Sequence, residues 1–347
     1  MAPTTTGVDR RDGGGGVLDG MAMAELLPSL PLETRCPPFP LRLYGGYWLP
    51  EWVLPGLEAV HARFDPRPSD VLLASFPKSG TTWLKALAFA VANRADHPPS
   101  GDAHPLRRSG PHDCVRFFES SFALAGEGGG DIFAASPSPR LLATHMPYSL
   151  LPERITASGS GCRIVYVCRD PKDAFISAWL FTTKNSTAHD RSVQKSASIE
   201  EVFDLFCAGR CVAGPQWQHV LEYWSESQRR PEKVLFLRYE EMLREPARSV
   251  RRLAEFLGCP FAEEEEAAGA VDAIVELCSI GQLRRVPANK TGATELGINK
   301  ESFFRKGAAG DWSNHISLEM AARLDAVVED ALRGSGFSFA AAGGDSE

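Results

Sequence analysis

The sequence predicts a single α/β domain in which a mostly parallel central sheet is flanked by helices on both faces. Short apolar segments of strand length alternate along the chain with longer segments that have the apolar spacing of helices. This order is typical of parallel strands joined by helices. An apolar strand, a turn of small residues and a helix also follow one another from Val71 to Leu87. No repeat is evident in the 347 residues, so one domain is the simpler interpretation.

The apolar segments predict the following elements in chain order. We expect strands at residues 71–76, 141–144, 163–168 and 234–238. We expect helices at residues 82–93, from 172 onward, and at 199–209, 212–229, 247–257, 263–278 and 318–332. Residues 1–35 are rich in Gly, Thr, Pro and Ala and indicate a flexible tail, and residues 340–347 indicate a disordered end. Residues 36–339 then form the domain.

Charge and cysteine usage narrow the class of protein. The formal net charge is −7, whereas a nucleic-acid binder is expected to show a basic excess. The eight cysteines form no C-x-x-C pair and no zinc-finger spacing, so we expect free thiols in a reducing compartment and no metal. No apolar stretch approaches the about 18 residues of a membrane span, and no secretory signal is visible. We therefore expect a cytoplasmic protein that binds neither nucleic acid nor a membrane.

The turn after the first strand has the composition of an anion site. Residues 76–83 read Phe-Pro-Lys-Ser-Gly-Thr-Thr-Trp. Small side chains let backbone N–H groups approach an anion, and the helix N-terminus adds free N–H groups and partial positive charge. Lys78 adds a point charge, and Trp83 offers a flat face for a purine. The four small residues between them are Ser79, Gly80, Thr81 and Thr82. The alternative is an ordinary strand-to-helix turn with a capping hydroxyl.

This turn is not the loop of nucleoside triphosphatases. The pattern G-x-x-x-x-G-K-[ST] requires glycine at positions 72 and 77, where this chain has Leu72 and Pro77. The loop is shorter and suits one phosphate group better than a triphosphate with Mg²⁺. Two alternatives stay open at this point: a P-loop kinase acting on a small alcohol or nucleoside, and a nucleotide-binding protein without catalysis.

Two further segments carry cations at positions suited to a second phosphate. Arg169 directly follows the strand at 163–168, and the planar fork of arginine donates two parallel hydrogen bonds to a phosphate. Asp170 follows it, and we expect a helix cap there; a Walker-B-like metal site is disfavoured because Arg169 fits an anion better than Mg²⁺. Arg305 and Lys306 precede Gly307 in a Gly-x-x-Gly turn, which combines charge with exposed backbone N–H groups.

His145 directly follows the short apolar strand 141–144. Such a residue lies at the carboxyl edge of a parallel sheet, where α/β enzymes place their sites. The unperturbed pKa of histidine, about 6.5, suits removal of a proton from a hydroxyl. A lone histidine is more often structural, and the other histidines, His112 among them, have no comparable context.

The four segments together resemble the cytosolic sulfotransferases, which use 3′-phosphoadenosine-5′-phosphosulfate (PAPS). Residues 76–83 resemble the 5′-phosphosulfate loop of that family, and the other segments occur in the family's order, so the resemblance covers about residues 40–337. It implies a sulfotransferase domain at 36–339 with a P-loop-like phosphosulfate-binding loop. It also implies that His145 is the general base, that Lys78 stabilises the leaving group, and that no metal takes part.

The resemblance also implies the remaining contacts with the co-substrate. The family's 3′-phosphate ligands correspond to Arg169, Ser177, Arg305, Lys306 and Gly307. Contacts with the adenine correspond to Tyr239 and to the turn Cys278, Ser279 and Ile280.

Two departures from animal members place the chain nearer the plant branch of the family. Animal members often carry a lysine two residues before the histidine, where this chain has Ala143. Their C-terminal dimer motif is poorly matched, so we expect a monomer or a weak dimer. The acceptor is then a small organic hydroxyl compound of the phenolic, flavonoid, steroid or hydroxyjasmonate type. Five aromatic residues either line an apolar slot for it or belong to the core: Phe117, Phe118, Phe122, Tyr148 and Phe181.

Overall fold

Four parallel strands form the central sheet of the protein. The computed structural model describes residues 22–36, 38–126, 130–185 and 197–339. The strands lie side by side in the order β5 (Leu141–Thr144), β4 (Val71–Ser75), β6 (Arg163–Cys168) and β7 (Val234–Arg238). Every neighbouring pair is parallel. The four strands predicted from the sequence are therefore confirmed, the first of them ending one residue earlier than expected.

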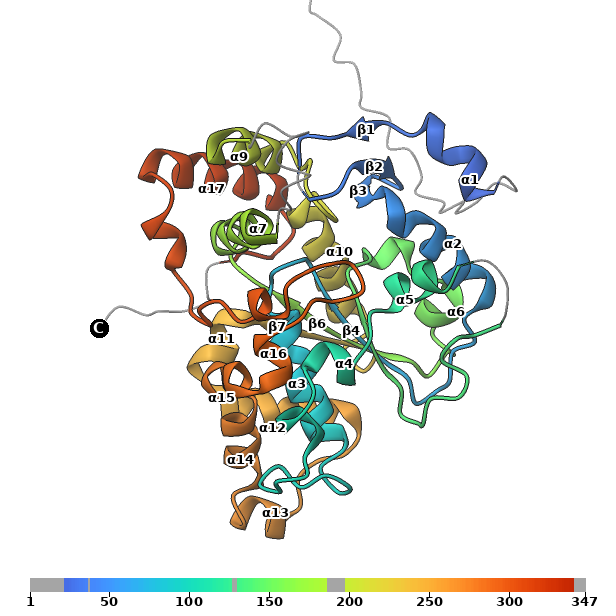
Figure 1. Cartoon of the computed structure of the whole chain (residues 1–347), viewed down its shortest axis with the longest axis vertical. Helices are drawn as coiled ribbons and strands as arrows, with labels where there is room; N and C mark the ends of the chain where they lie inside the picture. The colour runs from blue at the N-terminus through green and yellow to red at the C-terminus, as the bar shows by residue number, and fades with distance from the viewer. Residues whose placement is uncertain (1–21, 37, 127–129, 186–196, 340–347) are drawn as a thin grey trace, which may run out of the picture.

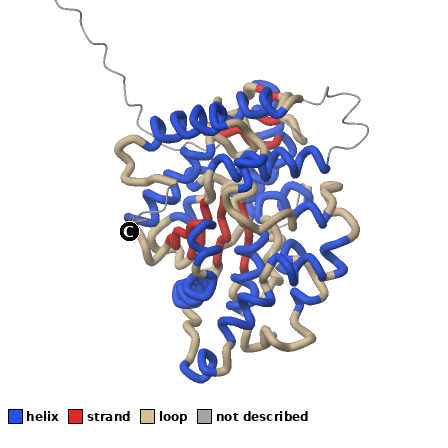
Figure 2. Tube along the Cα trace, turned by 90° about the vertical axis from the view of Figure 1, so that its left-hand side faces the viewer, coloured by secondary structure: helices blue, strands red, loops and turns tan. Residues whose placement is uncertain are grey.

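Alternate residues of each strand point to opposite faces, so the sheet separates two layers of core. On β6, Ile164 and Tyr166 belong to one buried cluster, whereas Val165 and Val167 belong to the other. Helices cover both faces, with the strands between them (Figure 2). The first cluster includes buried residues of α2 (Leu54–Arg63), α5 (Phe118–Ala125), α7 (Pro171–Asn185), α9 (Ile199–Cys207), α10 (Gln216–Arg229) and α17 (Leu318–Leu332). The second includes those of α3 (Thr81–Ala92), α12 (Pro246–Leu257) and α14 (Ala270–Leu277).

The N-terminal region is more ordered than its composition predicts. An antiparallel sheet is formed by β1 (Leu32–Glu33), β2 (Leu41–Tyr44) and β3 (Tyr47–Pro50). It lies above α2 at the top of the view in Figure 1. It follows α1 (Met23–Leu26), whose Met23 is fully buried.

The expected flexible tail at 1–35 is therefore wrong for residues 22–35, because they bury apolar side chains and pair with β2. Residues 1–21 and 340–347 lie outside the described part of the chain.

Two predicted helix boundaries are wrong for backbone reasons. The helix expected at 263–278 is two helices, α13 (Glu263–Ala267) and α14, because Gly269 has a φ of 75° that an α-helix cannot contain. The helix expected at 212–229 begins at Gln216, since Pro215 disfavours helical backbone at the residue before it. The remaining short helices are α4 (Pro111–Cys114), α6 (Glu153–Thr156), α11 (Tyr239–Arg244), α15 (Ile280–Arg285) and α16 (Pro287–Lys290). Single 3₁₀ turns occur at Leu27–Ser29, Glu51–Val53, Pro105–Arg107, Tyr148–Leu150, Lys300–Phe303 and Asp311–Asn314.

The carboxyl ends of the four parallel strands meet at one edge of the sheet. The loop that begins at Phe76 follows β4, and His145 follows β5. Arg169 follows β6, and Tyr239 follows β7. Residues from distant parts of the sequence are thereby gathered at the edge where parallel α/β folds bind ligands. Among the described helices, none is long and apolar enough to cross a membrane.

Candidate active site

A cavity of about 1040 Å³ opens at this edge of the sheet. Its walls include residues from every segment that the sequence singled out. They are Lys78, Gly80, Thr81, Thr82, Trp83, His145, Arg169, Ser177, Tyr239, Ile280, Arg305, Lys306 and Gly307. The fold therefore brings most of the predicted site residues to one cavity. Ser79, Cys278 and Ser279 are not among its lining residues.

The loop between β4 and α3 has a backbone that few side chains allow. Lys78 has a φ of 66° and Gly80 a φ of 110°. A Cβ atom on Gly80 would lie 2.7 Å from Cδ2 of Tyr239, so only glycine fits there. No side chain caps the N-terminus of α3, and the fully buried Ser79 hydroxyl has no hydrogen-bond partner among the described residues. The backbone N–H groups at the start of α3, which no side chain caps, fit an anion.

Lys78 lies in this loop, close to two aromatic rings and to the cations Arg169 and Arg305. Its Nζ is 3.6 Å from the centroid of the Phe181 ring and 5.7 Å from that of Phe303. Burial, together with the positive charges of Arg169 and Arg305, lowers the pKa of Lys78 to about 7. An anion bound beside Lys78 would favour its charged form.

One hydrogen bond orients the ring of His145, and a second holds its backbone. Its Nδ1 lies 2.8 Å from the carbonyl oxygen of Ser75, and its backbone N–H donates to Oε1 of Glu119 at 2.9 Å. Because a carbonyl only accepts, Nδ1 carries the proton and Nε2 of the neutral ring is left as an acceptor. Burial lowers the pKa of His145 to about 3; the bond to Ser75 opposes the shift, and the charges of Lys85, His219 and Lys78 add to it.

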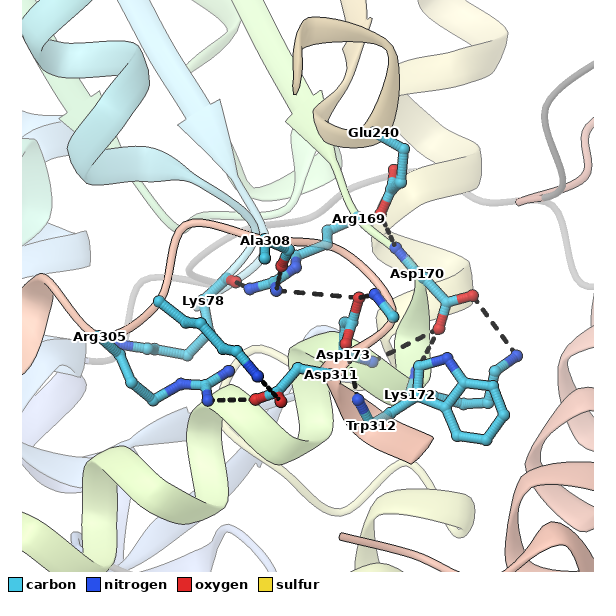
Figure 3. A network of polar contacts seen from close by, with 12 residues as sticks. Lys78, Arg169, Asp170, Lys172, Asp173, Glu240, Arg305, Ala308, Asp311 and Trp312 are labelled. Carbon is cyan, nitrogen blue, oxygen red and sulfur yellow. Dashed lines mark hydrogen bonds and ion pairs between the residues drawn. The ribbon is translucent and has the colours of Figure 1, made fainter. Parts of the chain in front are cut away.

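Arg169 joins the loop after β4 to the C-terminal segment (Figure 3). Its guanidinium donates to the carbonyl oxygen of Lys78 at 3.2 Å and to that of Ala308 at 2.9 Å. The guanidinium also lies over the Tyr239 ring, 4.7 Å from its centroid. Its Nε atom is buried without a hydrogen-bond partner in the described chain, which leaves a directed donor for a ligand. The Asp170 carboxylate accepts from the N–H of Lys172 at 2.8 Å, so Asp170 is a helix cap as expected.

Arg305 and Lys306, which were expected to face a phosphate, both pair with the carboxylate of Asp311. Figure 3 shows the pair of Arg305 with Asp311. Burial alone would raise the pKa of Asp311, but hydrogen bonds from Lys306, Arg305 and Asn314 hold it well below its usual value. Asp173 fixes the same turn by accepting from the N–H groups of Gly310 and Trp312 at 2.6 and 3.0 Å. Two cations, Arg305 and Lys306, are therefore already held together on one carboxylate in this turn.

The residues expected around the adenine separate into two groups. Tyr239 and Trp83 form an edge-to-face pair with centroids 5.7 Å apart on the cavity wall, together with Ile280. Cys278 is fully buried in the second core cluster, because it caps the C-terminus of α14, which packs against α3 and α12. The Ser279 hydroxyl accepts from the N–H of Gln282 and caps α15. In this turn only Ile280 reaches the cavity.

The expected aromatic slot is also only partly present. Phe117 and Phe181 line the cavity, whereas Phe118 and Phe122 are buried in the first core cluster. Tyr148 receives a hydrogen bond from Arg230 and does not line the cavity. Other large aromatic residues complete the apolar wall instead: Phe39, Trp52, Trp179 and Phe206.

Sequence reasoning missed several polar residues of the site. Glu119 is buried and accepts from the His145 backbone. Lys85 is fully buried and lies 3.0 Å from His112, whose other ring nitrogen lies 3.0 Å from the Thr82 hydroxyl. The sequence did contain one signal for Lys85: a charged residue inside an apolar helical segment, three residues after Thr82 and therefore on the same helix face.

Comparison with known proteins identifies the family of the chain. A family model described as a sulfotransferase domain matches residues 68–336. Cytosolic sulfotransferase 8 of Arabidopsis thaliana is 43% identical over 311 residues, which cover 90% of this chain and 91% of that protein. Cytosolic sulfotransferase 5 of the same plant is 42% identical over 314 residues, which cover 90% of this chain and 95% of that protein.

Solved structures give the same result. The crystal structure of a putative steroid sulphotransferase of Arabidopsis thaliana superimposes with a TM-score of 0.69 at 36% identity, covering 90% of this chain and 94% of that one. Retinol dehydratase in complex with androsterone and the inactive cofactor PAP has a TM-score of 0.69 at 20% identity, covering 92% and 96%, and shows the shared fold alone.

The parallel sheet, the match to the sulfotransferase domain and the cytosolic sulfotransferase relatives define an enzyme of the PAPS-dependent sulfotransferase class. The chain belongs to the sulfotransferase family, and within it to the plant cytosolic sulfotransferases.

Proposed function

We propose that this protein transfers a sulfonyl group from PAPS to the hydroxyl of a small organic acceptor, with His145 as the general base and Lys78 stabilising the leaving group. The observation that carries the proposal is that Nε2 of His145 has no hydrogen-bond partner in the described part of the chain, while His145 lines the same cavity as Lys78. A base without a proton and a cation beside an anion cradle are the two groups that this transfer needs.

The residues around the cradle fit the co-substrate. The loop from Lys78 to Trp83 would hold its 5′ end, since Lys78, Thr81 and Thr82 line the cavity there and no side chain caps the N-terminus of α3. The 3′-phosphate ligands would be Arg169, Ser177, Arg305, Lys306 and Gly307. The ring pair of Trp83 and Tyr239, with Ile280, suits the adenine. When bound, PAPS supplies the sulfonyl group.

His145 acts on the acceptor. Its Nδ1 keeps its proton and donates it to the carbonyl oxygen of Ser75, so Nε2 accepts the proton of the acceptor hydroxyl. The low pKa keeps the ring neutral in the unliganded protein, and therefore ready to accept a proton at neutral pH. The bond to Ser75 also aids proton transfer, because it stabilises the ring once both nitrogens are protonated.

Lys78 acts on the opposite side of the transferred group. Its ammonium places positive charge beside the loop, where the departing oxygen gains negative charge. An oriented charge of this kind contributes about 3 kcal/mol to the transition state. No lysine occupies position 143, where Ala143 is fully buried, so this contribution rests mainly on Lys78. We propose no metal; the described residues hold no cluster of His, Cys, Asp and Glu suited to one.

The acceptor would be a small apolar compound with a hydroxyl group, of the phenolic, flavonoid, steroid or hydroxyjasmonate type. The apolar wall formed by Phe117, Trp52, Trp179 and Phe206 supports a ring system. Relatives named cytosolic sulfotransferases support a cytoplasmic enzyme. We propose that it works as a monomer or weak dimer, without nucleic acid or a membrane.

A direct test offers the protein a panel of hydroxylated compounds with sulfur-labelled PAPS, and in parallel with ATP and Mg²⁺. We expect label on at least one acceptor with PAPS and no phosphorylated product with ATP. Phosphorylation of an acceptor would favour a kinase instead. Tight binding of PAP (3′-phosphoadenosine-5′-phosphate) without turnover of any acceptor would favour a non-catalytic nucleotide-binding protein.

A further inference from the structure

Lys85 is a fully buried lysine in the middle of α3, next to the proposed active site. Its Nζ lies 3.0 Å from Nδ1 of His112 and 3.4 Å from the centroid of the Phe117 ring. Phe117 in turn packs against the ring of His145, with centroids 4.8 Å apart. A buried amine is costly unless it is hydrogen-bonded, and the proposed reaction gives Lys85 no direct contact with either substrate.

His112 continues the contact toward the anion loop. Its Nε2 lies 3.0 Å from Oγ1 of Thr82, a residue that lines the cavity at the start of α3. The His112 ring also packs on Phe303 with centroids 4.1 Å apart, so its orientation is held from a second side. Lys85, His112 and Thr82 thus form a continuous hydrogen-bonded chain from the core to the loop.

We propose that Lys85 and His112 are positioning residues that fix the Thr82 hydroxyl as a donor to the 5′-phosphate of the bound nucleotide. The inference rests on the proposed function, since it assigns the loop to that phosphate. Lys85 Nζ donates to Nδ1 of His112. The proton of the neutral ring then lies on Nε2 and is donated to Oγ1 of Thr82.

The direction of this chain decides what Thr82 offers the ligand. A hydroxyl has one hydrogen to donate and two lone pairs that accept. When His112 donates to one lone pair, the hydrogen of Thr82 stays available for a phosphate oxygen. Without Lys85, the other tautomer of His112 becomes accessible, and Thr82 can then donate to the ring instead of the ligand. Donation into the oxygen also polarises the O–H bond and strengthens it as a donor.

The test compares two nucleotides that differ only at the 5′ end. PAP carries both phosphates, whereas adenosine 3′-phosphate lacks the 5′-phosphate. We expect Lys85→Met to weaken PAP binding by about fivefold to tenfold, measured by calorimetry, while the affinity for adenosine 3′-phosphate stays within about twofold. Equal losses for both ligands would overturn the proposal, because they indicate a general change in structure.

A double-mutant cycle tests whether Lys85 acts through Thr82. Thr82→Val removes the hydroxyl, so adding Lys85→Met to it should cause no further loss of PAP affinity. If the loss of PAP affinity in the double variant equalled the product of the two single losses, Lys85 would act independently of Thr82, and the relay would be overturned.

A second pair of variants leaves Lys85 in place. In His112→Gln the amide donor occupies the position of Nε2, so PAP affinity should fall by less than about twofold, whereas His112→Phe should match Lys85→Met. This pair decides the question should Lys85→Met fail to fold, and equal affinities in the two variants would overturn the relay. Wild-type protein that bound no PAP would overturn the proposed function as well; wild-type binding with unchanged variants would overturn the relay alone.

Discussion

Nδ1 of His145 lies 2.8 Å from the carbonyl oxygen of Ser75, the last residue of the neighbouring strand β4. The contact joins the end of β4 to the residue that follows β5, two strands that are paired in parallel. It orients the ring by backbone alone, so the tautomer does not depend on a titrating partner. The sheet itself therefore prepares His145 to accept a proton through Nε2.

Replacing His145 should abolish most turnover and spare nucleotide binding. We expect His145→Ala to lower kcat by about 10²- to 10⁴-fold, the usual contribution of a general base. The dissociation constant for PAP, measured by calorimetry, should be unchanged. The matched control is His61→Gln: His61 contacts the carbonyl of Leu150 and lies outside the cavity lining, so this variant should retain wild-type kcat. Near-normal turnover in His145→Ala would refute the assignment.

Lys78 should make nucleotide binding dependent on pH. Its pKa is lowered to about 7 in the unliganded protein, so Lys78 is mostly neutral at pH 8 and mostly charged at pH 6. Bound phosphates favour the charged form, so PAP binding should take up a proton at pH 8, about half a proton at pH 7 and little at pH 6. PAP affinity should accordingly fall as the pH rises above 7.

Calorimetry in buffers with different ionisation enthalpies measures this proton uptake. The phosphates of PAP can also change protonation, so the informative quantity is the difference between wild type and Lys78→Met. If PAP binding to Lys78→Met still took up a proton at pH 8, the proton would bind to a group other than Lys78.

Gly80 should tolerate no side chain. An added Cβ would lie 2.7 Å from the Tyr239 ring, and the φ of 110° is unfavourable for other residues. We expect Gly80→Ala to weaken PAP binding more than tenfold and to lower the free energy of unfolding by about 1–3 kcal/mol. Gly269 offers a matched control, since its φ is 75° but nothing lies within 4 Å of an added Cβ. Gly269→Ala should cost about 1 kcal/mol and leave PAP binding unchanged; equal effects on binding would contradict the role of the cradle.

Buried histidines should make the fold sensitive to acid. Burial lowers the pKa values of His104 and His219 to about 4 and that of His145 to about 3, and it lowers that of His112 well below its usual range. In the unfolded chain these groups bind protons as the pH falls through about 6.5, whereas the folded state does not. Stability is therefore fully present above that pH and is lost at lower pH, by about 1 kcal/mol per pH unit for each histidine.

Urea unfolding at pH 7, 6 and 5 measures this slope. His104 provides the control because its Nδ1 accepts from the N–H of Leu106, a role that asparagine also fills without titrating. His104→Asn should reduce the slope by about 1 kcal/mol per pH unit; an unchanged slope would assign the acid sensitivity to other groups.

Much of the site was predictable because its signals are local. The anion loop, its strand and its helix occupy one continuous stretch from Val71 to Ala92, where an apolar run, small residues and helical spacing follow in order. The β2–β3 hairpin also had a local signal that was missed, since Gly45-Gly46 separates the two strands with positive φ at both positions. Their burial does not alternate strictly, so apolar spacing did not predict them.

The sequence by itself determined the parallel strands, the Lys78 loop and His145 at the carboxyl edge, because apolar spacing and turn chemistry act between near neighbours. Tertiary structure decided which groups finally meet. It buried Cys278 in the second core cluster, set Asp311 between Arg305 and Lys306, and placed Lys85 beside His112. Lys85 and His112 are 27 positions apart in the sequence. Only the packing of α3 against α4 brings them within hydrogen-bonding distance.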